Sequence, residues 1–493
     1  MLKERISSAL PNRLLPRWEA RPWDVGKIRR RGRALAALAA AIPLLLPAPG
    51  ESQTAGQNRI SIIRDAEVEA LIQDYARPLF KAAGIRPQAI EIFVVPDPTF
   101  NAFVATNRSM FINIGALLDS KTPNEIIGVI AHETGHLANA HLVRMQQMMR
   151  NVSTASMIAG VIAMGAIVAG AQSNPGLGDS AGGVMAGIGE AAKRDILSYA
   201  RGIEMEADRA GLSYLEATGQ SGEGMLITFR RLADDTLLLA RDANPYLLSH
   251  PLPRERIALL ESAVAKSKYR TKKDPPALQR RHDLMRAKLS GFSESRERVA
   301  RRYPASDTSL PARYARAILA YRFDGAARAA PLIDALIHAD PDNPYFWELK
   351  GQSYLEAGRP RNAIPPLRKA VALASAQGSQ SGLLRILLGQ ALVDSGDASL
   401  TDEAIKNLNV GLLADPAAST GYRTLARAYA AKGDIGQAQL ATAQGLLAEG
   451  KVEEAKIQAK RAQAKLKEGS PAWLRADDIV AYKPPPKSGV GLQ

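Results

Sequence analysis

Two histidines four residues apart flank a glutamate in the segment His132-Glu133-Thr134-Gly135-His136. Thr122 and Pro123 just upstream have the residue types of an N-cap and a first helical position, and Glu125 completes a capping box. The motif is therefore expected inside one α-helix. Because four residues make about one helical turn, both imidazoles would project from one face and could bind a single zinc ion. Glu133 would lie beside that ion and suits a general base for an attacking water.

A zinc site of this kind needs a third protein ligand, and the chain has no cysteine to supply one. The segment Glu204-Met205-Glu206-Ala207-Asp208 falls in a second predicted helix, which runs from about residue 190 to 218. Glu204 and Asp208 are one turn apart and would share a face, whereas Glu206 would point away. One of the two carboxylates could bind zinc while the other accepts the spare N–H of a ligand histidine. His141 would lie about 140° around the first helix from His136 and is not expected to be a ligand.

The composition limits the remaining classes of function. The chain has 493 residues, of which 46% are hydrophobic and 23% charged, as in a globular protein of two to four domains. The absence of cysteine excludes a disulfide scaffold, a thiol nucleophile and a lipidated N-terminal cysteine. The net charge is +15, but residues 1–33 contribute +7 of it, so 15 − 7 = +8 remains for the other 460 residues. This mild basicity predicts no nucleic-acid partner.

The first 50 residues are predicted to be a signal peptide. A basic segment, residues 27–33, precedes the uncharged apolar run Ala34–Leu46 and then Pro47-Ala48-Pro49-Gly50. We expect cleavage between Ala48 and Ala55, and therefore a periplasmic protein if the producer is a Gram-negative bacterium. The alternative is a short membrane anchor that is not cleaved.

The rest of the chain divides into a mixed part and a helical part. Residues 60–262 mix helical patterns with the predicted strands Ile90–Val95 and Ser109–Ile114, and the second strand is expected at the edge of the sheet, where an extended substrate could add to it. Residues 263–305 are predicted to be a helical connector, 310–478 a helical repeat domain, and 479–493 a disordered tail. The predicted fold is a mostly helical α+β zincin-type domain with a small edge sheet, followed by an all-α solenoid.

The C-terminal third carries spacings typical of tetratricopeptide (TPR) repeats. Offsets 4, 8, 11, 20, 24 and 27 of one unit are occupied by Trp347, Gly351, Tyr354, Ala363, Leu367 and Ala370. Further copies follow at Gly389 and Tyr422, the first of them with about three extra residues, and a degenerate copy begins near Pro311. Stacked repeats of this kind form a concave surface that binds another protein. The alternative is an ordinary alanine-rich helical bundle.

Val152–Ala171 is a run of twenty residues without a charge, between the two predicted zinc helices. Its length could cross a bilayer. A single span would, however, place the two zinc helices on opposite sides of the membrane, and the run is dominated by alanine and glycine. We therefore favour a lid or a helix that contacts the membrane peripherally, above the active site.

Together, H-E-x-x-H and E-x-x-A-D resemble the motifs of the gluzincin peptidase family that contains HtpX and the CAAX prenyl protease. Asn101-Ala102-Phe103, Arg201 and the segment from His250 to Ile257 resemble further elements of that family. The resemblance covers residues 60–262. It implies one Zn²⁺ held by His132, His136 and Glu204, with Glu133 as the general base and Asp208 as the partner of a ligand histidine. His250 would be a regulatory fourth ligand that keeps the enzyme latent, or alternatively a helix-capping histidine.

With an export signal in front and repeats behind, the resemblance implies a zinc endopeptidase of the bacterial envelope that degrades misfolded or unassembled outer-membrane proteins. The repeats would dock on the outer-membrane assembly machinery and could add chaperone activity. The alternative is a non-proteolytic periplasmic chaperone or scaffold with a vestigial metal site, which the intact Glu133 disfavours. A prenyl peptidase is not expected, because that chemistry needs a chamber of several membrane spans.

Overall fold

The computed structural model describes residues 61–106, 108–151, 190–238, 246, 250, 254–379 and 381–484. The predicted signal peptide, the Val152–Ala171 run and the chain beyond residue 484 lie outside the described residues. Within them, no helix combines the length and the apolar character that crossing a bilayer requires.

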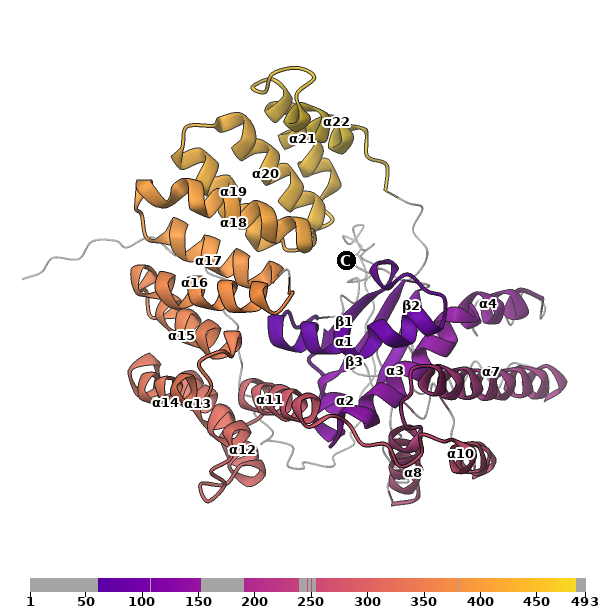
Figure 1. The fold of residues 1–493 in the computed structure, drawn as a ribbon. Coiled ribbons are helices and arrows are strands. Elements are labelled where there is room, and N and C mark those ends of the chain that lie inside the picture. The colour runs from indigo at the N-terminus through magenta and orange to yellow at the C-terminus, as the bar shows by residue number, and fades with distance from the viewer. Residues whose placement is uncertain are drawn as a thin grey trace, which may run out of the picture. The chain divides into compact units, whose positions relative to one another are not determined.

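The first part of the described chain surrounds a small sheet with helices (Figure 1). Its elements are α1 Ala66–Ala82, β1 Glu91–Val95, β2 Ala102–Thr106, β3 Ser109–Asn113, α2 Ile114–Asp119, α3 Pro123–Ala138, α4 His141–Asn151, α7 Glu190–Ala217, α8 Glu223–Leu238 and α10 Arg254–Lys266. The predicted start of α3 is confirmed: Pro123 is its first residue, and the Thr122 N–H donates to Glu125 Oε1 over 3.2 Å. The mostly helical character with a small sheet is confirmed as well.

The three strands lie in the order β1-β3-β2. β1 and β3 are parallel, with Phe93 opposite Phe111, while β2 and β3 are antiparallel, with Phe103 opposite Phe111. The expectation that Ser109–Ile114 forms an edge strand is wrong, because β3 pairs on both sides. Its backbone groups pair with both neighbours, and β1 and β2 are the edge strands instead. The strands predicted from the sequence include β3 but not β2, whose pairing decides the order.

One face of the sheet packs on the helices and the other carries aromatic rings. Met110 and Ile112 of β3 are fully buried in the core cluster that also contains the apolar residues of α1 and α3. On the opposite face, the ring of Phe111 stacks on Phe93 and on Phe103, with centroids 5.2 and 5.1 Å away. Because side chains alternate along a strand, Met110 and Ile112 face the helices while Phe111 lies in the aromatic layer on the other face.

Glycines allow α3 to cross its neighbours closely. A Cβ on Gly135 would lie 2.8 Å from the Ala207 carbonyl oxygen of α7, and one on Gly211 would lie 3.1 Å from the backbone of Ala131. A Cβ on Gly128 would lie 2.6 Å from Cβ of Met225 on α8. Such distances leave no room for a side chain, so glycine at these positions lets α7 approach α3 at the level of the two motifs.

The segment between residues 263 and 305 forms α11 Pro276–Ser293 and α12 Arg296–Arg302. Met285 and Leu289 of α11 belong to the same core cluster as α1 and α3. His282 of α11 lies 3.0 Å from the Tyr75 hydroxyl and 2.8 Å from the Ser120 carbonyl oxygen. α11 thus packs on the first part of the chain through these residues, while its Leu284 and Ala287 belong to the core cluster of α13, Leu310–Asp324. The domain boundaries themselves remain a prediction.

The rest of the described chain is a series of packed helix pairs, consistent with a repeat array (Figure 1). The helices are α13 Leu310–Asp324, α14 Ala326–Ala339, α15 Pro344–Glu356, α16 Pro360–Ala376, α17 Gly382–Asp394, α18 Thr401–Ala414, α19 Ser419–Ala431, α20 Ile435–Ala448, α21 Val452–Gln463 and α22 Pro471–Ala481. A Cβ on Gly351 would lie 2.4 Å from Leu367, and one on Gly389 would lie 2.5 Å from Leu408. The extra residues of the second unit form a short 3₁₀-helix, Ala398–Leu400.

Candidate active site

Helix α3 carries the histidine pair on its buried side. His132 and Glu133 have no exposed surface, and the side chain of His136 is 11% exposed. The two rings lie 4.8 Å apart between centroids, with Nε2 of one 3.1 Å from Nε2 of the other. The one-turn spacing thus brings one nitrogen of each imidazole to a common point.

Helix α7 brings Glu204 to the same point. Glu204 Oε2 lies 3.4 Å from His132 Nε2, and Oε1 lies 3.5 Å from His136 Nε2. His250 joins them, with its Nδ1 3.1 Å from both oxygens of Glu204. One atom from each of these four side chains falls within 4.8 Å of the others. Two imidazoles, a carboxylate and a further imidazole are ligands that zinc takes in proteins.

Asp208 occupies the position behind His132. Its Oδ1 is 2.9 Å from His132 Nδ1, on the side of the ring that faces away from Glu204. The Arg256 guanidinium donates to both Asp208 oxygens, over 2.7 and 2.8 Å, and its Nη1 lies 3.0 Å from Glu204 Oε2. Arg256 is buried, so this one cation holds the carboxylates of Asp208 and Glu204 in place.

Glu133 lies beside the cluster, with its Oε1 3.6 Å from His250 Nε2. It is fully buried, and within the described part of the chain neither of its carboxylate oxygens accepts a hydrogen bond. Burial raises the pKa of this carboxyl above its ordinary value. A general base that faces a metal ion and its water needs a carboxylate whose oxygens are free to accept a proton. Glu133 has such oxygens, and it lies next to the candidate metal ligands. The residues present therefore fit a zinc ion.

The protonation of the cluster follows from burial and close charge. Burial disfavours charge on His132, but the carboxylates of Asp208 and Glu204 outweigh it and raise the pKa of His132 to about 9. Burial lowers the pKa of His136 well below its usual range. Burial would raise the pKa of Glu204, but the neighbouring His250 and His136 hold it well below its ordinary value. Glu204 is therefore a charged ligand candidate at neutral pH.

Sequence reasoning assigned no role to two residues at this site. Arg256 was visible only as part of the His250–Ile257 element, and its contact with Asp208 spans 48 residues of chain. His141 lies against His136, with its Nδ1 3.1 Å from His136 Nδ1. The expected angle of about 140° between His136 and His141 assumed one continuous helix. It does not apply, because α3 ends at Ala138 and α4 begins at His141. Arg201, which the family resemblance had singled out, is exposed.

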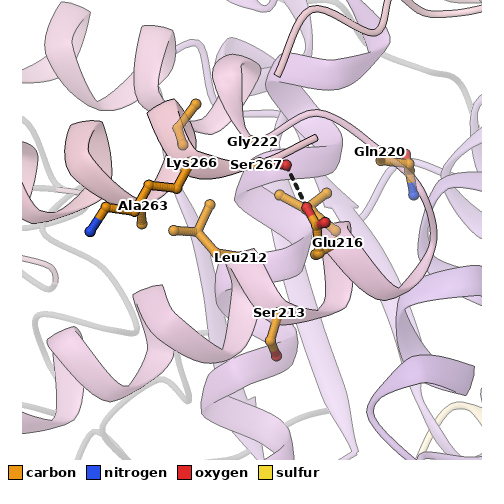
Figure 2. A pocket seen from close by; sticks show the side chains of 10 residues that line it. Leu212, Ser213, Glu216, Gln220, Gly222, Ala263, Lys266 and Ser267 are labelled. Atoms are coloured by element: carbon orange, nitrogen blue, oxygen red, sulfur yellow. Dashed lines mark hydrogen bonds between the residues drawn. The ribbon is translucent and has the colours of Figure 1, made fainter. Parts of the chain in front are cut away.

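A separate pocket lies between the end of α7 and α10, with a volume of about 290 Å³ (Figure 2). Leu212, Glu216 and Lys266 are among the residues that line it, and the Ser267 hydroxyl donates to Glu216 across it. None of its lining residues belongs to the histidine and carboxylate cluster. The candidate active site is therefore the cluster between α3 and α7, where the candidate metal ligands converge.

Comparison with known proteins points to the same residues. Residues 63–264 match the model of peptidase family M48. The beta-barrel assembly-enhancing protease of Escherichia coli strain K12 is 24% identical over 380 residues, or 75% of this chain and 73% of the relative. A Vibrio cholerae protein provisionally given that name is 26% identical over 310 residues, and the matched part spans 59% of its length.

A shorter relative is similar over less of the chain. Protease HtpX of Shewanella baltica is 27% identical over 237 residues, which cover 43% of this chain and 79% of HtpX. The matched family segment contains the H-E-x-x-H motif and Glu204, and the geometry places these residues in one candidate metal site. Residues 63–264 therefore belong to peptidase family M48 and form a metallopeptidase domain.

Proposed function

We propose that the protein is a zinc-dependent endopeptidase of the bacterial envelope that degrades misfolded or unassembled outer-membrane proteins. The observation that carries the peptidase part is the convergence of His132, His136 and Glu204 beside the buried Glu133. The envelope part is supported by the relatives named as beta-barrel assembly-enhancing proteases and by the signal-like sequence of residues 1–50.

In this proposal His132, His136 and Glu204 are the ligands of one zinc ion. Asp208 accepts the Nδ1–H of His132 and so keeps the lone pair of Nε2 directed at the metal. Arg256 fixes Asp208 and Glu204 against each other. His250 is the regulatory fourth ligand, since its Nδ1 already lies among the ligand atoms.

A bound zinc ion supplies Lewis-acid activation of water and of the peptide carbonyl. Glu133 removes the proton from the attacking water and later delivers it to the leaving amine. Its raised pKa suits both steps, because a base with a pKa closer to neutrality also returns its proton readily. His250, at 3.6 Å from Glu133, would restrain this carboxylate while it occupies the site.

Selection of the substrate would rest on backbone recognition and on docking. β2 is an edge strand of the sheet, and the other edge strand, β1, already forms a bridge with Ile63, so an extended segment of substrate could pair with the outer edge of β2. Pairing through the backbone favours unfolded or unassembled chains over one sequence. The repeat array would hold the substrate or the outer-membrane assembly machinery on its concave side, and chaperone activity would follow from the same surface.

The non-proteolytic scaffold is the competing proposal, and Glu133→Gln separates the two. The purified variant and the wild type would be incubated with a urea-unfolded outer-membrane β-barrel protein after dilution of the urea, and its fragments would be followed by gel. The enzyme proposal predicts one zinc per chain in both proteins and loss of cleavage in the variant alone. Equal cleavage by both proteins, or no cleavage by either the zinc-loaded wild type or the zinc-loaded His250→Ala variant, would contradict it.

A further inference from the structure

His136 presents its two ring nitrogens to different neighbours. Nε2 faces the candidate metal site, 3.5 Å from Glu204 Oε1. Nδ1 faces away from it and lies 3.1 Å from Nδ1 of His141. The two rings stand nearly perpendicular, at 83°, with their centroids 5.0 Å apart. One nitrogen of this pair must therefore donate a hydrogen to the other.

The backbone bends sharply to bring His141 to this place. Helix α3 ends at Ala138, and Ala140 has a φ of 48°, in the left-handed region that a residue with a Cβ rarely adopts. The next residue, His141, begins α4 with its side chain only 2% exposed. A strained residue persists where the surrounding structure requires it, and it marks positions worth a functional explanation.

The contact continues beyond His141. Nε2 of His141 lies 3.3 Å from Glu206 Oε2, and the Arg144 guanidinium donates to the same carboxylate over 2.9 and 3.1 Å. Glu206 is the residue of α7 that turns away from Glu204 and Asp208. The order of groups from the metal site outward is thus imidazole, imidazole, carboxylate and guanidinium.

We propose that His141 is a positioning residue for His136, with Glu206 as its anchor. His136 Nδ1–H donates to His141 Nδ1, and the Glu206 carboxylate, 3.3 Å from His141 Nε2, favours the tautomer of His141 that carries its proton on Nε2. This arrangement leaves the lone pair of His136 Nε2 free and directed at Glu204. His132 is held by the carboxylate of Asp208 directly, at 2.9 Å, whereas His136 reaches its carboxylate through a second imidazole. The inference rests on the zinc site of the proposed function.

The dissociation constant of zinc tests this role, because it is measured without substrate. The full-length wild type, His141→Leu, His141→Asn and Glu206→Ala would compete with a chromophoric chelator for zinc, and circular dichroism would report their folding. His338→Leu is the matched control, since His338 is exposed on α14. Loss of an outer hydrogen-bond partner typically weakens metal binding by about 10- to 100-fold.

We expect a loss of that size for His141→Leu and a smaller loss for Glu206→Ala. His141→Asn should recover most of the affinity, because its Oδ1 can accept the His136 Nδ1–H from nearly the same position. The control should bind like the wild type. Should His141→Leu fail to fold, the comparison of His141→Asn with Glu206→Ala still applies.

Two results would overturn the inference while leaving the metal site in place. One is zinc affinity of a folded His141→Leu within about threefold of wild type, well below the expected loss. The other is an Asn variant that binds as weakly as the Leu variant, which would mean that His141 acts by packing alone. Absence of zinc binding by the wild type would instead refute the proposed function and this inference together.

Discussion

Lys288 of α11 is the residue outside the active site whose loss we expect to destabilise the protein most. Its side chain is 5% exposed, and its Nζ lies 2.8 Å from Asp65, 3.0 Å from Glu348 and 3.5 Å from Glu67. Asp65 is the N-cap of α1, and Glu348 belongs to α15, so this single ammonium group joins the start of the peptidase domain to the repeat array. The Tyr314 hydroxyl also donates to Glu67.

Lys288→Met keeps the length of the side chain and removes its charge. Three carboxylates would then share a buried site without a cation, and breaking a buried ion pair in this way costs about 3–5 kcal/mol of unfolding free energy. Burial raises the pKa of Glu67 to about 7, above an ordinary value of 4.5. The folded state therefore binds more protons than the unfolded state between these values, and the stability this contributes is lost as the pH rises through about 7.

Loss of the ammonium raises the pKa of Glu67 and of Glu348 further, so the cost of Lys288→Met should be largest at pH 8 and smaller at pH 6. Urea unfolding followed by circular dichroism at both pH values measures it. The control is Lys350→Met, because Lys350 pairs with Asp334 over 2.7 Å on the exposed surface, where an ion pair contributes about 1 kcal/mol or less. The reasoning fails if both variants lose the same free energy at pH 8, or if the loss at Lys288 does not change with pH.

Three further predictions concern the core and the site. Burial lowers the pKa of His282 to about 4, so this group binds more protons in the unfolded state between pH 6.5 and 4, and its own contribution to stability should fall by about 3 kcal/mol on acidification through that window. In the same urea titrations the stability of the wild type relative to His282→Gln should fall with pH by this amount, and a difference that does not change with pH would contradict the assignment. Gly211→Leu should separate α7 from α3 and abolish zinc binding, as measured by metal analysis. Gly202→Leu on the same helix should retain the metal, because a Cβ at this position would have no atom of the described residues within 4 Å. His250→Ala should increase cleavage of an unfolded barrel protein if His250 is a latch; unchanged activity with zinc retained would count against that role.

Local patterns in the sequence were sufficient for the elements of the site. The start of α3 follows from Thr122, Pro123 and Glu125, whose capping interactions involve only neighbouring residues. The predicted end of the helix that carries Glu204 is confirmed to within a residue, because Gly219 takes a φ of 66° that stops the helix there. Periodicity then places side chains on a common face without any knowledge of tertiary structure.

The remaining features depend on contacts that no local pattern contains. His141 reaches His136 because the chain reverses at Ala140, a non-glycine residue with a positive φ that sequence alone gives no reason to expect. Arg256 binds Asp208 from a different helix. The central position of β3 depends on pairing with β2, whose five residues carry only a weak strand pattern. In each case the deciding interaction joins segments that the sequence separates.

The zinc content of the purified protein tests the central claim most directly. Metal analysis of the wild type should give one zinc per chain, and Glu204→Ala should lose most of it because the variant lacks the negatively charged member of the candidate ligand set. Glu216→Ala, a change of the same type on the same helix, should retain the metal, since Glu216 lines the separate pocket. Equal zinc in the wild type and Glu204→Ala, or none in the wild type, would contradict the account.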